Sequence, residues 1–339
     1  MAVPRVAAAP VGASSSGRPL VSPRPLGVGF PYVTGVPASF YRAGLIDFVE
    51  VTPELLCRER RDGARRTLEL IPAALDRARE ACQDLPMVVH GVELSIGSAA
   101  GWNVAYVEML DRLWSCWPFQ WHSEHLGFQT IPRSAETHLP EDFVETGVPL
   151  PLPNTLEAVA VVAPRAAALG ARYGTPFLLE NPAHYLPGLP DDEEIGGEAG
   201  LMNRITVEGD CWQLLDLHNL YCNALNLGRD IDELLREVRW ERVLEIHVAG
   251  GSWRNGYYMD GHDGAVPEQV WQVLEKVLPR ATNVAGLVFE VLDQAAARLG
   301  PNIIEVELER LRRIWQRSRK SSPRQAQGMP SCSPDFKHC

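Results

Sequence analysis

The chain lacks the long apolar run that a membrane-spanning helix needs. No stretch of about 18 apolar residues occurs in its 339 residues. The N-terminus also lacks a basic segment followed by a continuous apolar stretch, which is the pattern of a secretory signal. We therefore expect a cytoplasmic protein with no membrane partner.

The cysteine and basic residues also disfavour a disulfide-stabilised protein and a nucleic-acid-binding protein. The seven cysteines include no C-x-x-C pair, and their odd number fits reduced thiols better than a disulfide framework. The net charge is −11, because 43 Asp and Glu outnumber 32 Lys and Arg. A nucleic-acid surface normally has a basic face, so this balance disfavours nucleic acid as a partner, although a local basic groove stays open.

The remaining composition is that of an ordinary globular enzyme. A hydrophobic share of 45% with 22% charged residues allows a large core, so no structural metal is needed for folding. Residues 1–25 and 319–339 are low in complexity and without periodicity, and we predict that both are disordered tails. Residues 26–318 then form a single domain, because α/β barrels often run to about 250 residues or more.

Eight short apolar runs each end in, or are closely followed by, residues that can bind a metal. The runs are GVGF, FVEVTPE, MVVHG, FQWHSEHLG, FLLEN, LLDLHN, LEIHVAGG and LVFE. They recur every 30 to 40 residues or so, which is the length of a βα unit. The pattern predicts an α/β fold, a TIM (β/α)8 barrel, in which the strand ends converge on one face and bring distant residues together.

Helical patterns follow nearly every run. The clearest have apolar residues at spacings of three and four and cover residues 65–82, 103–117, 155–174, 231–240, 267–278 and 303–317. Two polar stretches rich in Pro and Gly, residues 130–153 and 182–200, interrupt the repeat. Loops of that length in a compact domain are usually functional or disordered, and on a barrel they would overhang the site.

Metal-binding side chains concentrate after the last four runs. The strand-end residues and the D-G-H motif that follows the seventh run supply Glu180, Asp216, His247, Asp260, His262 and Glu290. Neighbouring carboxylates would repel one another, so a cluster of cations is their natural partner. Mixed imidazole and carboxylate donors suit Fe, Mn or Zn.

Each of these residues by itself has a simpler explanation. A single His90 or His247 is more often a structural histidine than a ligand, and Glu180 or Glu290 could cap a loop amide. Glu54 could be the carboxylate of a helix N-terminus. The coincidence of donors at six or more strand ends is what favours a metal site.

The segments HGVELSIGS, SEHLGF, LLEN, LLDLHNLYCNALNLG, IHVAGG, DGHD and VFE occur in this order. Together they resemble the multinuclear non-haem iron-dependent oxidases, the family of the methanobactin biosynthesis oxidase, over roughly residues 26–300. The resemblance implies a xylose-isomerase-like TIM barrel with two or three irons. It also implies oxidative modification, with O2, of cysteine or other residues in ribosomally made precursor peptides, often with a small partner protein that recognises the leader.

The resemblance also implies a set of ligands. These are His90, Glu124, Glu180 or Asn181, Asp216, His247, Asp260, His262 and Glu290. Of them, the residues expected to be catalytic are His90, Glu124, Asp216, His247 and Glu290. Two positions depart from the pattern that the resemblance implies. Thr52 stands where many relatives have a histidine, so one metal position is altered, weakened or supplied by Glu50 or Glu54. His218 stands where Asn is common and could compensate for Thr52.

Two other metalloenzymes of the same superfamily are alternatives. Trinuclear zinc apurinic endonucleases have a similar set of strand-end ligands, but their Asp-x-x-His becomes Asp216-Leu-His-Asn219 in this chain. The acidic charge balance is also poorly suited to gripping DNA. A metal-dependent sugar isomerase or epimerase is the second alternative. A barrel that only binds a ligand is the least favoured, because an open multi-metal mouth is costly to maintain without chemistry.

Overall fold

Eight parallel strands form a closed barrel in the order β1-β14-β11-β10-β9-β6-β5-β2. The computed structural model describes residues 22–62, 65–132 and 143–320. The barrel strands are β1 (Gly27–Pro31), β2 (Phe48–Val51), β5 (Met87–Gly91), β6 (His122–His125), β9 (Phe177–Glu180), β10 (Trp212–Asp216), β11 (Val243–Val248) and β14 (Gly286–Phe289). Each of the eight apolar runs contributes one strand, so the TIM-barrel prediction is confirmed.

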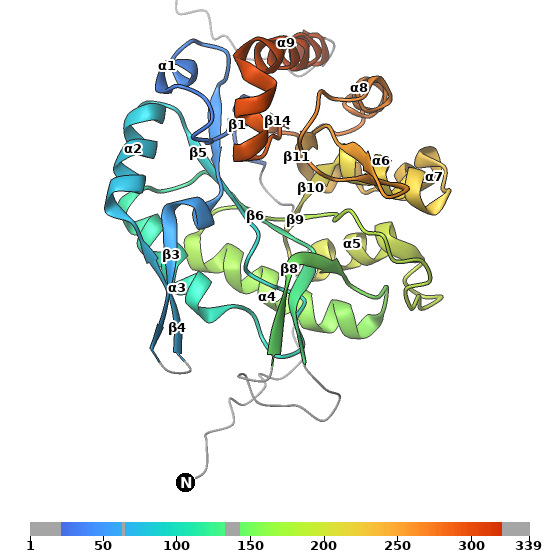
Figure 1. Ribbon diagram of the computed structural model, residues 1–339. Helices are drawn as coiled ribbons and strands as arrows, with labels where there is room; N and C mark the ends of the chain where they lie inside the picture. The colour runs from blue at the N-terminus through green and yellow to red at the C-terminus, as the bar shows by residue number, and fades with distance from the viewer. Residues whose placement is uncertain (1–21, 63–64, 133–142, 321–339) are drawn as a thin grey trace, which may run out of the picture.

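Helices surround the strands (Figure 1). They are α1 (Ala38–Tyr41), α2 (Pro72–Cys82), α3 (Val104–Cys116), α4 (Leu156–Tyr173), α5 (Gly197–Glu208), α6 (Leu217–Leu227), α7 (Ile231–Arg236), α8 (Glu268–Val277) and α9 (Asp293–Lys320), with 3-10 turns η1 (Pro53–Leu56) and η3 (Trp240–Arg242). The helical patterns over 103–117, 155–174 and 267–278 match α3, α4 and α8. The pattern over 231–240 is divided between α7 and η3, while α5 and α6 were not among the predicted helices.

Apolar side chains fill the barrel interior on the amino-terminal side of the strand ends. This apolar plug consists of Phe48, Val88, Trp121, Leu178, Trp212, Leu214, Leu244, Ala285 and Val288. Gly29 makes room for it, since a Cβ there would lie 2.4 Å from the Phe48 ring. Burial of each large side chain stabilises the fold by roughly 1.5–3 kcal/mol. The plug therefore closes the barrel below the polar strand ends.

Three β-hairpins extend from the loops that follow barrel strands. They are β3 (Cys57–Asp62) with β4 (Arg65–Leu70), β7 (Gly127–Pro132) with β8 (Phe143–Pro151), and β12 (Ser252–Arg254) with β13 (Tyr257–Met259). They follow β2, β6 and β11, so they start from the mouth where parallel strands end. The first two extend towards the lower edge of Figure 1.

Two of these hairpins correct the sequence predictions. Residues 65–70 were expected to be helical, but they pair with β3, and the helix begins only at Pro72. Proline is tolerated in a first helical turn and breaks a helix interior, which is why one helix cannot span 65–82. The predicted loop 130–153 contains the end of β7 and all of β8, and its residues 133–142 lie outside the described part of the chain. The predicted loop 182–200 ends early because α5 begins at Gly197.

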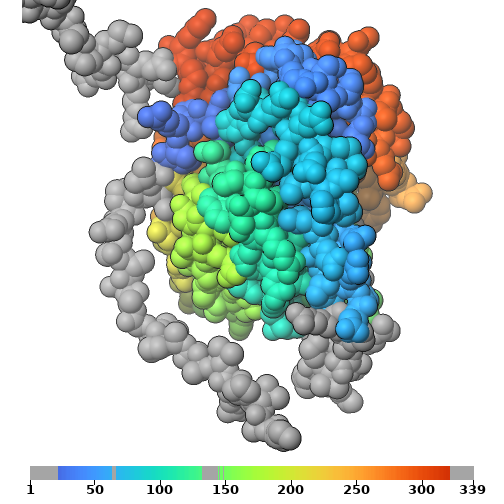
Figure 2. All heavy atoms as spheres, turned by 90° about the vertical axis from the view of Figure 1, so that its left-hand side faces the viewer, coloured from blue at the N-terminus to red at the C-terminus, as the bar shows by residue number. Residues whose placement is uncertain are grey.

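The C-terminal helix is longer than predicted. α9 covers the pattern over 303–317 and begins at Asp293, with a break at Gly300, whose φ is 74°. Arg319 and Lys320, which we assigned to the C-terminal tail, are its last residues. Figure 2 shows α9 along the upper edge of a face formed by the segments from α1 to α3. Within residues 22–62, 65–132 and 143–320, no helix is long and apolar enough to cross a membrane.

Candidate metal centre

Histidines and carboxylates at the strand ends point into the barrel above the apolar plug. In a parallel sheet, residues in register lie on the same face. His125 of β6 is in register with Glu180 of β9, and Asp216 of β10 is in register with His247 of β11. The closed barrel turns these inward faces towards one another, so the four side chains meet at its mouth.

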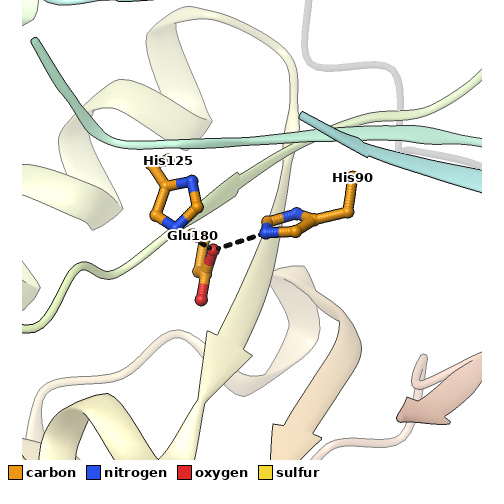
Figure 3. Close-up of side chains that lie close together, drawn as sticks. All are labelled: His90, His125 and Glu180. Atoms are coloured by element: carbon orange, nitrogen blue, oxygen red, sulfur yellow. Dashed lines mark ion pairs between the residues drawn. The ribbon is translucent and has the colours of Figure 1, made fainter. Parts of the chain in front are cut away.

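Glu180 lies between two histidines (Figure 3). Its Oε2 atom is 3.1 Å from His90 Nε2 and 3.2 Å from His125 Nε2. His90 Nδ1 lies 2.9 Å from the Ser123 hydroxyl, which donates to the Val89 carbonyl at 3.1 Å. Ser123 Oγ must therefore accept from His90, which places the proton on Nδ1 and leaves the Nε2 lone pair directed at the cluster.

His247 occupies the centre of the cluster and contacts carboxylates from both sides of its ring. Its Nδ1 atom is 3.1 Å from Glu290 Oε2 and 4.0 Å from Asp216 Oδ2. Its Nε2 atom is 3.1 Å from Glu50 Oε2 and 4.0 Å from Glu245 Oε1. One imidazole therefore joins carboxylates from β2, β10 and β11 with the one that follows β14.

Asp260 and His262 extend the cluster towards the loops of the mouth. His262 Nδ1 lies 3.2 Å from Glu290 Oε1, and its Nε2 lies 2.7 Å from Asp260 Oδ1. The same Asp260 oxygen is 2.9 Å from His218 Nδ1. The backbone N–H of Asp260 donates to the Tyr185 hydroxyl at 2.9 Å, so the segment after β9 also reaches this edge.

The electrostatics of the cluster call for positive charge. Its six carboxylates, whose ion-pair partners in the described residues are histidines, are Glu50, Glu180, Asp216, Glu245, Asp260 and Glu290. Burial, reinforced by Glu180, raises the pKa of Asp216 to about 8, and burial raises the pKa of Glu180 to about 7. Burial also acts on Glu290, but His262 and His247 outweigh it and hold the pKa of that carboxyl well below its ordinary value.

The donor atoms fit a multinuclear metal centre. Buried atoms without a hydrogen-bond partner include Glu50 Oε2, His90 Nε2, Glu180 Oε2, Asp216 Oδ2, Glu245 Oε1, His247 Nε2 and His262 Nε2. Four sets in the described residues have donor atoms within 4.8 Å of one another: His90, His125 and Glu180; Glu180, Asp216, His247 and Glu290; Glu50, Glu245 and His247; and His218, Cys222 and Asp260. Unpaired buried polar atoms are costly, and bound cations would satisfy them.

Glu124 does not join the cluster, contrary to the prediction. Side chains alternate along β6, so Ser123 and His125 point into the barrel and Glu124 points towards the helices. There its Oε1 atom lies 2.7 Å from His122 Nε2, and burial raises the pKa of Glu124 to about 8. The imidazole of this strand that reaches the cluster is therefore that of His125.

Asn181 lies beside the cluster, but its side-chain amide is hydrogen-bonded to the backbone of Asp216. Its Nδ2 donates to the Asp216 carbonyl at 2.9 Å, and its Oδ1 accepts the Asp216 N–H at 2.9 Å. Asn219 has a related place, because its Nδ2 donates to Glu180 Oε1 at 3.1 Å. Of the two alternatives at this strand end, Glu180 is the side chain that reaches the cluster, and Asn181 is bonded to the backbone of Asp216.

Three residues of the cluster were absent from the predicted set. Ser123 and His125 lie two residues apart on β6, and Glu245 precedes His247 by two, so each pair shares one face of its strand. Period two could have added Glu245 to the predicted His247, but it does not show which face of β6 is inward. Thr52, where the resemblance implies a histidine, precedes η1, and its side chain makes no capping hydrogen bond. Glu50, two residues earlier on β2, is the side chain of this strand that reaches His247.

The fold and the site together define a TIM barrel whose mouth carries candidate metal-binding clusters of histidine and carboxylate side chains. A family model described as "RiPP precursor modification enzyme MbnB/TglH/ChrH" matches residues 27–313. The chain belongs to this family of enzymes, which modify the precursors of ribosomally synthesised and post-translationally modified peptides. The resemblance found in the sequence is thereby confirmed, and a precursor peptide is the class of substrate.

Relatives cover most of the barrel. A UPF0276 protein of Caulobacter vibrioides is 32% identical over 278 residues, which are 82% of this chain and 89% of the relative. Another, from Chromobacterium violaceum, is 35% identical over 208 residues, which are 60% of this chain and 71% of the relative. Among solved structures, a D-psicose 3-epimerase in the presence of D-fructose aligns with a TM-score of 0.48 and 11% identity, over 87% of this chain and 98% of the epimerase.

Proposed function

We propose that this enzyme oxidises a cysteine-containing precursor peptide, using two or three bound iron ions and O2. The observation that carries the proposal is the set of unpartnered histidine and carboxylate atoms converging at the barrel mouth. Oxygen and imidazole donors suit iron, manganese or zinc, and of these iron is the one that activates O2. Membership of a peptide-modifying family supplies the class of substrate.

The proposed iron ligands come from two of the sets of donor atoms. His90, His125 and Glu180 would hold one ion, and His247 with Asp216 and Glu290 would hold a second. Bound iron would supply the activation of O2 for oxidation of the substrate cysteine. Glu180 belongs to both sets, so its carboxylate would help to hold either ion.

Several side chains would keep this centre rigid and dry. Ser123 holds His90 in the tautomer that presents Nε2, while the amide of Asn219 orients one oxygen of Glu180. The apolar plug closes the interior below, and Trp121 of the plug donates its indole N–H to Glu245 Oε2 at 2.8 Å. Water would therefore reach the centre only from the mouth, through which the peptide would also enter.

The peptide would contact apolar side chains exposed around that mouth. Trp253 and Tyr257 of the β12–β13 hairpin are 62% and 47% exposed, and Leu186 is 48% exposed. The Tyr257 ring lies 6.0 Å from the ring of Tyr185, whose hydroxyl contacts the Asp260 backbone. Exposed aromatic residues beside a polar site are typical of binding surfaces. A small partner protein would recognise the leader of the precursor.

Anaerobic purification followed by metal analysis tests this function. After iron is restored, we expect O2 consumption that depends on a short cysteine-bearing precursor encoded near this gene, with a mass change in the peptide. A protein that holds zinc alone and consumes no O2 after iron is restored would overturn the proposal. Cleavage of abasic DNA or epimerisation of a sugar would assign it to one of the alternatives.

Replacement of His247 by Ala provides the corresponding test of the site. This side chain contacts four carboxylates, so its loss should remove bound metal and activity. The fold should persist, because the apolar plug and the helices do not depend on it, and circular dichroism measures this. A His247→Ala protein with full metal content would show that the ions lie elsewhere.

A further inference from the structure

Helix α6 presents a histidine and a cysteine to the edge of the metal centre. His218 and Cys222 are four residues apart, so they lie on the same face of the helix, one turn from each other. Both side chains are completely buried. This face is directed at Asp260, the carboxylate that closes the cluster on the side of the mouth loops.

The donor atoms of these three residues are close enough to share one ion. His218 Nδ1 lies 2.9 Å from Asp260 Oδ1, and Cys222 Sγ lies 3.9 Å from each ring nitrogen of His218. All three residues offer donor atoms within 4.8 Å of one another. Nitrogen, oxygen and sulfur ligands of a four-coordinate zinc lie roughly 3.3–3.6 Å apart, so the distances fit after small side-chain rotations.

A fourth side chain points to the same place. His262 is 8% exposed, and its Nε2 atom has no hydrogen-bond partner although it lies 2.7 Å from Asp260 Oδ1. The imidazoles of His218 and His262 therefore both lie against the same oxygen of Asp260. Gly251 packs against the other edge of His218, where a Cβ would come within 3.0 Å of the ring, so the imidazole has little freedom to turn away.

We propose that His218, Cys222 and Asp260 form an additional metal position, in which the Cys222 thiolate is a ligand. Its donor set differs from the rest of the centre, which offers only imidazole and carboxylate. A thiolate favours a softer cation, so this position would take a divalent ion such as Zn²⁺ or Fe²⁺. On binding, the Cys222 S–H bond is replaced by a sulfur–metal bond, and the proton is released to solvent.

Substitution of Co²⁺ into the metal-free full-length protein tests this position, because thiolate ligation gives a sulfur-to-cobalt charge-transfer band in the near ultraviolet. We expect Cys222→Ser, a nearly isosteric change, to abolish the part of this band that arises from Cys222 and to lower the metal content by one ion per chain. Cys222→Ala should do the same. The contribution of the other cysteines persists in both variants and is subtracted.

Cys211 provides a matched control. It is also a buried thiol, 1% exposed, but it precedes β10 and so lies at the end of that strand opposite to the cluster. Cys211→Ser should therefore leave the band and the metal content unchanged. Identical spectra for wild type and Cys222→Ser would overturn the proposal, even where the remaining ions still bind. That result differs from a failure of the iron centre, which His247→Ala tests.

Discussion

The two faces of strand β6 carry adjacent residues with opposite surroundings. His125 points into the barrel and contacts Glu180, whereas Glu124 points outward and contacts His122 in the layer between strands and helices. The carboxylates of Glu180 and Glu124 are both buried, and each lies 3.2 Å or less from an imidazole nitrogen. What differs is the number of neighbouring acids, and this difference separates a metal centre from an internal hydrogen-bonded pair.

The outward group, which consists of Glu124, His122 and Glu54, can be electrically neutral without a bound cation. Burial raises the pKa of Glu124 to about 8 and that of Glu54 to about 7, while burial lowers the pKa of His122 to about 3. Glu54 Oε1 also accepts the backbone N–H groups of Val92 and Glu93, both at 2.8 Å. A neutral acid beside a neutral imidazole needs no cation. The inward cluster, with six carboxylates, has seven buried donor atoms without a hydrogen-bond partner, whereas the outward residues have Glu54 Oε2 and His122 Nδ1.

The largest difference between the two faces is expected when one carboxylate is replaced on each face in two separate variants. Glu180→Gln keeps the shape but removes a carboxylate shared by two sets of donor atoms, so we expect loss of bound metal and a fall in activity of about 100-fold or more. The matched change Glu124→Gln, on the neighbouring strand, should keep the metal content. Metal analysis of both proteins measures this. Equal loss of metal in the two variants would contradict the assignment of the faces.

A smaller effect is expected from the residue that orients His90. Ser123→Ala removes the hydroxyl that accepts from His90 Nδ1, so the ring is no longer held in one tautomer. Partners of this kind typically contribute about 10- to 100-fold in metal affinity. Competition with a chelator measures the affinity, and Ser115→Ala, at an exposed position on α3, is the control. Unchanged affinity in Ser123→Ala would mean that Ser123 does not orient the ligand.

Glu124, on the outward face, should also affect the pH dependence of stability. The pKa of Glu124 is raised from 4.5 to about 8 in the folded protein. The contribution of protonated Glu124 to the free energy of unfolding is therefore fully present below about pH 4.5, and it is lost as pH rises through about 8. In metal-free protein, Glu124→Gln should remove part of this loss, on the order of a few kcal/mol. Denaturant unfolding at about pH 5 and about pH 9 measures the difference, and parallel curves for the two proteins would refute it.

The smallest change is expected outside both groups, at the rim of the mouth. Trp253 is exposed on the β12–β13 hairpin and does not belong to any of the sets of donor atoms. Trp253→Ala should raise KM for the precursor peptide several-fold, with kcat and metal content nearly unchanged, because only binding of the peptide is weakened. Steady-state kinetics separate the two parameters. A fall in kcat with constant KM would exclude this role.

Much of the barrel could be predicted because parallel strands read as continuous apolar runs. The same property limited the prediction of the site. FQWHSEHLG contains both His125 and Glu124, but β6 is buried on both faces, so no alternation of polar and apolar residues marks the inward one. The hairpin at 65–70 was missed for a different reason, since its pairing with β3 is a contact between segments that local periodicity does not register.

The sequence by itself determined that this chain forms a βα barrel and that its donors cluster after the strands, because element order and strand-end chemistry are local properties. Only the tertiary structure decided which donors meet. It selected His125 over Glu124 and Glu50 over Glu54, added Glu245, and turned Asn181 to the backbone of Asp216. The physical reason is that the direction of a side chain in a closed barrel depends on the register of neighbouring strands, which is set by packing around the whole ring.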